Sequence, residues 1–72
     1  MANSTTDIFR KNLKIYRTQK GYTQEALSEI CDISTDYLSQ IERGVRTPSF
    51  KRMELIANAL GIEVFKLFMP LD

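Results

Sequence analysis

Apolar residues recur along the chain at helical spacing, and their runs leave no room for a sheet. The first run places Phe9, Leu13 and Tyr16 on one face of a helix. Thr5 or Thr6 is expected to cap its start, because a threonine hydroxyl can accept a hydrogen bond from a free backbone N–H. The pattern along the whole chain predicts about five helices and therefore an all-α fold.

Two short helices are predicted next, separated by a tight turn over residues 31–34. Thr23 caps the second helix, and Ser34 caps the third, which runs to Arg43 and is terminated by Gly44. The apolar residues expected on the inner faces of these two helices are Ala26, Leu27, Ile30, Leu38 and Ile41.

A fourth helix is predicted to begin at Thr47-Pro48, where proline would be the first helical residue, and to end before Gly61. A fifth, short helix holds residues 64–68, and Pro70 stops it. The apolar residues assigned to the inner faces of these helices are Phe50, Met53, Ile56, Ala57, Leu60, Val64, Leu67 and Phe68. Connections this short are typical of a compact domain.

The 72 residues suffice for one small domain, predicted at 8–69 between a flexible N-terminus at 1–7 and a C-terminal tail at 70–72. The single cysteine cannot form an internal disulfide, and histidine, a common metal ligand, is absent. We expect no metal, no cofactor and no small-molecule ligand, and we expect oligomerisation to add stability. The sequence has no signal-like or membrane-spanning apolar run, so a cytoplasmic, nucleoid-associated protein is expected.

The net charge of +1 weakly disfavours a non-specific nucleic-acid binder, but the distribution of charge matters more than the sum. One basic group contains Arg10, Lys11, Lys14, Arg17 and Lys20, and a second contains Arg43, Arg46, Lys51 and Arg52. Both groups are compatible with a nucleic-acid surface and equally with an ordinary mixed surface. The sequence shows neither a metal constellation nor a glycine-rich phosphate loop, so we expect no enzyme activity.

Several segments together resemble a known family. They are Thr23–Ser28, Ile33-Ser34, Tyr37–Gly44, Thr47–Ser49 and Ile56–Ile62, with Arg17 preceding them. This combination resembles the phage-repressor and Cro-like family, the XRE-type helix-turn-helix, over about residues 8–69. The resemblance implies a compact, lambda-repressor-like five-helix domain that binds palindromic operators as a dimer. Its third helix is then expected to enter the major groove of DNA.

The third helix presents a polar face if Leu38 and Ile41 point inward. Gln40 could pair with adenine, and Arg43 could donate to guanine or phosphate. Thr35 could donate a hydrogen bond or touch a thymine methyl group. The resemblance implies DNA contacts for Thr35, Asp36, Tyr37, Ser39, Gln40 and Arg43. Asp36 is alternatively a helix-terminus charge, the Tyr37 ring could pack on the helix edge, and the whole face could simply be solvated.

Other positions are predicted to grip the DNA backbone or to hold the domain together. The resemblance implies a phosphate contact and a brace on the third helix for Gln24, and we expect backbone contacts from Arg46, Thr47 and Lys51. It also implies a partly buried ion pair between Arg17 and Glu42, which makes Glu42 a structural residue and not a DNA contact. A solvated Glu42 is the alternative.

Some residues depart from the family pattern or from the core pattern. Asp32 stands where the family usually has glycine, at a turn residue expected to need a positive φ. Ile8 and Ile15 are expected to pack against the last helix, and Cys31 to be a small core residue. Leu55, Phe65 and Met69 fall off the core stripes and are the candidates for a homodimer surface, although scattered exposure would also explain them.

The sequence therefore favours a sequence-specific transcription regulator, of repressor or controller type, that binds double-stranded DNA as a homodimer. The operator is expected to be an inverted repeat with half-sites ~10 bp apart. The alternative is a protein-interaction or antitoxin-type module with weak or no DNA binding. Polar residues on the outer face of the third helix favour DNA, whereas an apolar face would favour a protein partner.

Overall fold

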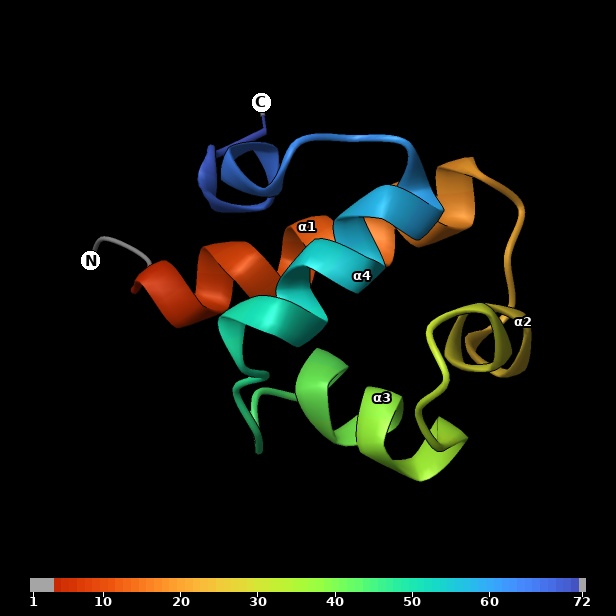
Figure 1. Cartoon of the computed structure of the whole chain (residues 1–72). Helices are drawn as coiled ribbons and strands as arrows, with labels where there is room; N and C mark the ends of the chain where they lie inside the picture. The colour runs from red at the N-terminus through yellow and green to blue at the C-terminus, as the bar shows by residue number, and fades with distance from the viewer. Residues whose placement is uncertain (1–3, 72) are drawn as a thin grey trace.

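The computed structural model describes residues 4–71, which form four α-helices and one 3₁₀-helix and contain no strand. The α-helices are α1 (Thr5–Gln19), α2 (Gln24–Ile30), α3 (Thr35–Glu42) and α4 (Phe50–Leu60), and the 3₁₀-helix is η1 (Val64–Phe68). Figure 1 shows η1 and α3 on opposite sides of α1, and α1 contacts both. The all-α class is as predicted, whereas the count of five helices needs correction because the last one is a short 3₁₀ turn.

Serine side chains cap α1 and α4, and both helices begin at positions other than those predicted. Ser4 Oγ accepts from the backbone N–H of Asp7 at 3.1 Å, so α1 begins earlier than a cap at Thr5 or Thr6 would allow. The first turn of α1 thus lies within the segment predicted as a flexible N-terminus, and the domain limits at 8 and 69 stay a prediction. Ser49 caps α4 in the same way, so Thr47-Pro48 precedes the helix instead of starting it.

The core is formed by apolar side chains from every helix. Its buried members are Phe9, Leu13, Leu27, Cys31, Leu38, Ile41, Met53, Ile56, Ala57, Leu60 and Leu67. Two residues assigned to the core are instead exposed, Ile30 by 54% and Phe50 by 80%. Both lie at helix ends, where a side chain can turn away from the buried face. Leu27 on α2 and Cys31 directly after it face the core instead of Ile30, and Met53 is the first buried residue of α4.

The C-terminal 3₁₀-helix is held on α1 by a buried amide and by stacked rings. Asn12 is 3% exposed, and its Nδ2 donates to the carbonyl oxygens of Leu67 at 3.0 Å and Met69 at 2.7 Å. The rings of Phe9 and Phe68 stack with their centroids 5.2 Å apart. These contacts hold η1 and Met69 against α1, and no pattern in the sequence indicated the role of Asn12.

Asp32, in the turn between α2 and α3, has a φ of +57°. This confirms the expected left-handed conformation at a residue that carries a Cβ. Replacing Asp32 by glycine is expected to raise the free energy of unfolding by up to ~1 kcal/mol, because glycine removes the clash of Cβ with the following carbonyl oxygen. Chemical denaturation of wild type and Asp32→Gly measures the change, and a clear loss of stability would show that the aspartate side chain itself stabilises the turn.

Candidate nucleic-acid interface

The turn between α2 and α3 sets the two helices at a fixed orientation. The N–H of Ile33 donates to the carbonyl of Ser28 at 3.0 Å, which closes the end of α2. Ser34 then caps α3 by accepting from the N–H of Tyr37 at 3.0 Å. Leu27 and Leu38 are completely buried, so both helices are anchored in the core and α3 turns its polar side outward.

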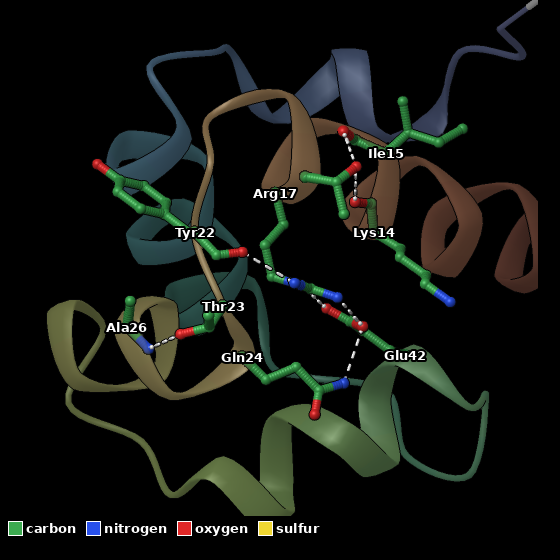
Figure 2. Close-up of polar contacts among 9 residues, drawn as sticks. Lys14, Ile15, Arg17, Tyr22, Thr23, Gln24, Ala26 and Glu42 are labelled. Atoms are coloured by element: carbon green, nitrogen blue, oxygen red, sulfur yellow. Dashed lines mark hydrogen bonds and ion pairs between the residues drawn. The ribbon is translucent and has the colours of Figure 1, made fainter.

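A buried ion pair joins α1 to α3. Arg17 Nε donates to Glu42 Oε2 at 2.7 Å, and Arg17 Nη2 donates to Glu42 Oε1 at 3.0 Å. The Arg17 side chain is 9% exposed and that of Glu42 is 4% exposed. Figure 2 shows the guanidinium between this carboxylate and the carbonyl oxygen of Tyr22, to which Nη1 donates at 2.9 Å. The structure thus brings together the two residues predicted to pair, and Glu42 is not solvated.

Gln24 adds α2 to this network. Its Nε2 donates to Glu42 Oε1 at 3.0 Å, as Figure 2 shows. The predicted brace between the start of α2 and the third helix is therefore present. A side-chain amide carries two N–H groups. One N–H of Gln24 bonds to Glu42, and the half-buried side chain keeps a second donor.

A pair of hydroxyl groups links α2 to the first turn of α3. Ser28 is 2% exposed, and its Oγ donates to the carbonyl of Glu25 at 2.9 Å. Thr35 Oγ1 lies 3.0 Å from Ser28 Oγ. Because the one hydroxyl proton of Ser28 is used on Glu25, Thr35 is the donor in this second contact. A ligand bound on the outer side of α3 can therefore contact the methyl group of Thr35 or donate to its hydroxyl oxygen, but cannot accept a hydrogen bond from it.

A chain of exposed hydrogen bonds runs along the outer side of α3. Gln40 Nε2 donates to Asp36 Oδ2 at 3.0 Å, and Arg46 Nε donates to Gln40 Oε1. Arg46 belongs to the connection between α3 and α4, so this chain ties that connection to the helix. Arg43 is exposed at the end of α3 and Ser39 is half-buried. The outer side of α3 is polar and open to solvent.

Comparison with known families decides what this arrangement is. A helix-turn-helix family model (HTH_3) matches residues 13–67. The chain belongs to the helix-turn-helix family. In this chain, α2 and α3 are the two helices of the helix-turn-helix, as the sequence predicted.

Relatives and solved structures agree with this assignment. A hypothetical transcription factor from Neisseria meningitidis is 32% identical over 59 residues, which is 82% of this chain, and the chain spans 56% of that relative's length. The restriction–modification controller C.AhdI from Aeromonas hydrophila superposes with a TM-score of 0.83 at 35% identity, over 88% of this chain and 96% of that one. The biofilm regulator SinR, solved in complex with DNA, superposes with a TM-score of 0.80 at 32% identity, over 85% of this chain and 98% of that one.

The other residues predicted to contact the DNA backbone follow α3 in the chain. Thr47 is exposed in the connection after α3. Lys51 is exposed on α4 and lines a recess with Asp32 and Leu55. No role was predicted for Arg52. Its side chain reaches from α4 to α3, where its guanidinium carbon lies 5.3 Å from the centre of the Tyr37 ring. Its position in the second basic group was the available signal.

Gly44 ends the helix-turn-helix and cannot readily be replaced. Its φ is +80°, and a Cβ at this position would lie 3.0 Å from Cδ of Arg10. Arg10 also donates through Nε to Asp7 at 3.1 Å, and this hydrogen bond lowers the pKa of the Asp7 carboxyl. The side chain of Arg10, on α1, therefore lies against the connection that follows α3. At a separate place, the end of α2, burial raises the pKa of the Cys31 thiol.

The candidate dimer residues are exposed, but they do not share one recess. Leu55 is 43% exposed and lines a shallow recess with Ile62 and Val64. Phe65 and Met69 are 58% and 52% exposed on and just after η1. A homodimer surface over these residues stays a prediction. Ile8 and Ile15, predicted to pack against the last helix, line a recess with Pro70 and Leu71, which follow η1, and Ile15 is 38% exposed.

Residues 4–71 were also compared with the requirements of a membrane-spanning helix and of a metal site. None of their helices has both the length and the apolar character needed to cross a bilayer. Nor do the side chains described there gather three histidine, cysteine or carboxylate ligands around one point.

Proposed function

We propose that this protein binds double-stranded DNA in a sequence-specific manner and regulates transcription as a repressor or a controller. The observation that carries the proposal is the open polar side of α3, backed by α2 and held by the Arg17–Glu42 pair. A helix placed in this way can enter the major groove, whose base edges form a distinct pattern for each base pair. A regulator of this kind acts in the cytoplasm, on the nucleoid.

The base-reading residues in this proposal lie on α3. Gln40 reads adenine with its amide, after exchanging the contacts to Asp36 and Arg46 for contacts to the base. Arg43 donates to guanine or to phosphate. Thr35 touches a thymine methyl group, because its hydroxyl proton is used on Ser28. The residues of α3 proposed to contact DNA are Thr35, Asp36, Tyr37, Ser39, Gln40 and Arg43.

Phosphate contacts on either side of α3 fix the register of the protein on DNA in this proposal. The second amide N–H of Gln24 donates to a phosphate while the first remains on Glu42. Arg46, Thr47 and Lys51 contact the strand beyond α3. SinR, which shares this fold, was solved in complex with DNA, and this supports DNA binding by the present chain.

We further propose a homodimer on an inverted repeat. The exposed apolar residues Leu55, Phe65 and Met69 are the proposed interface, because several such residues on a small domain are typical of an association surface. Sedimentation with and without the bound duplex measures the assembly. A monomer at high micromolar concentration under both conditions would rule out this part of the proposal.

Selection of bound duplexes from a random pool tests the function directly. We expect an inverted repeat with half-site centres ~10 bp apart. Gln40→Ala is expected to lose about 1–3 kcal/mol of discrimination at one base pair of each half-site, because the bidentate contact to adenine is removed. Gln19→Ala, at an exposed position of α1, is the matched control and should select the wild-type motif. A pool that shows no enrichment with wild type would reject DNA recognition, and a motif without symmetry would reject the dimer.

A further inference from the structure

A polar cleft of about 420 Å³ lies between α3 and the start of α4. Its lining includes Ser34 and Asp36 from the start of α3, Tyr37 and Gln40 further along it, and Arg46 and Arg52 from beyond it. No proposed contact above uses Arg52. The cleft opens on the same side of the molecule as Gln40, so a ligand on α3 passes its mouth.

The Tyr37 ring positions both arginines of the cleft. The guanidinium carbon of Arg52 lies 5.3 Å from the ring centre, and that of Arg46 lies 6.0 Å from it. A guanidinium that stacks on an aromatic ring keeps its N–H edge free for a planar anionic partner. Within residues 4–71, neither arginine has a carboxylate in ion-pair distance. The two cations are thus held near each other without a neutralising partner.

The electrostatics of the cleft favour an anion. Arg46 and Arg52 bring two positive charges, and Arg52 also lies in the first turn of α4, at the positive end of that helix dipole. Asp36 brings one negative charge, and its carboxylate already accepts from Gln40. The balance of the lining is therefore positive. Its open, polar shape is poorly suited to enclosing a small organic molecule, for which an apolar pocket is typical.

We propose that this cleft binds a phosphodiester group of the DNA backbone, with Arg52 as its principal ligand and Tyr37 as the platform that orients the guanidinium. The inference rests on the proposed function, because it requires a duplex lying on α3. Arg46 links the cleft to the base-reading amide of Gln40, so a strand read by Gln40 runs past Arg52. The phosphodiester carries two equivalent oxygens, which match the paired N–H groups of a guanidinium.

The test measures affinity against salt concentration on the selected operator and on a scrambled duplex of equal length. Arg52→Ala is expected to weaken binding about five- to tenfold on both duplexes, and to reduce the slope of log affinity against log salt by about one. Arg52→Lys should keep the slope and recover only part of the affinity, because an ammonium lacks the planar fork. Lys66→Ala is the matched control, since Lys66 is exposed on η1, on the far side of α1 from α3.

Each of the other possible results would contradict the proposal that this cleft binds a DNA phosphodiester, and the results can be told apart. If wild type binds DNA and Arg52→Ala binds with the same affinity and salt slope, the phosphodiester site in the cleft is rejected and the proposed function stands. A changed base preference would make Arg52 a base reader. Saturable binding of inorganic phosphate at Arg52, measured by calorimetry without DNA, would assign the cleft to a free anion instead. Failure of wild type to bind any duplex would reject both the function and the cleft. Melting curves of each variant verify that it is folded.

Discussion

Replacement of Arg17 by methionine is expected to lower the free energy of unfolding by about 3–5 kcal/mol. The substitution leaves the Glu42 carboxylate, 4% exposed, with only the amide of Gln24 as a partner. It also removes the donor from the carbonyl of Tyr22. A small domain has about 5–15 kcal/mol of stability in total, so the variant should unfold at a much lower denaturant concentration. Urea denaturation followed by circular dichroism measures the difference.

The double variant Arg17→Met/Glu42→Leu separates loss of charge from loss of packing. Two well-packed apolar residues can replace a buried ion pair at little cost, so we expect the double variant to recover most of the lost stability. Glu42→Gln should be destabilised as well, because it leaves the Arg17 charge unpaired. An unchanged melting temperature for Glu42→Gln, or a double variant as unstable as Arg17→Met, would show that the pair contributes little.

The helix-turn-helix could be predicted from sequence because its signals are local. Thr23 and Ser34 cap the two helices and Gly44 follows the second, whereas the left-handed conformation of Asp32 was expected from the resemblance. The two caps and the terminating glycine depend on neighbours within a few residues. Local signals also misplaced the start of α4. Thr47-Pro48 has the pattern of a helix start, but the side chain that caps α4 is that of Ser49.

Contacts between distant residues were predictable only where the resemblance supplied them. It implied the Arg17–Glu42 pair, which joins positions 25 residues apart. No pattern pointed to the hydroxyl of Ser28, which determines what Thr35 can donate. The second basic group included Arg52 but did not indicate that it reaches Tyr37 from another helix. Such contacts depend on how helices pack, and helical periodicity identifies the buried face without identifying the partner.

The last helix shows this limit most clearly. Its apolar spacing predicted an α-helix, yet residues 64–68 form a 3₁₀ turn whose carbonyl oxygens are taken by Asn12, more than fifty positions earlier. A 3₁₀ turn is typical of so short a segment, and a buried side chain can satisfy the carbonyls that helix termini leave free. Asn12 therefore takes the place of a capping motif within the segment itself.

Asn12→Asp is accordingly expected to cost about 3 kcal/mol at neutral pH, because an ionised carboxylate cannot donate and would face backbone carbonyl oxygens in a buried site. In the folded state the pKa of the introduced carboxyl is raised above the unfolded value of about 3.9, since burial and the carbonyl oxygens disfavour its charged form. Its contribution to stability is therefore fully present below that value and is lost as the pH rises through the folded-state pKa.

The difference in unfolding free energy between wild type and Asn12→Asp should thus grow as the pH is raised from acid to neutral. Denaturation at several pH values measures this difference, and Asn58→Asp is the matched control because Asn58 is exposed on α4. The control should show little pH dependence, since its carboxyl stays in water in both states. Asn12→Leu should be destabilised at every pH, because the carbonyls of Leu67 and Met69 lose their donor without any titrating group. An Asn12→Asp variant whose deficit is independent of pH would show that the amide acts by packing alone.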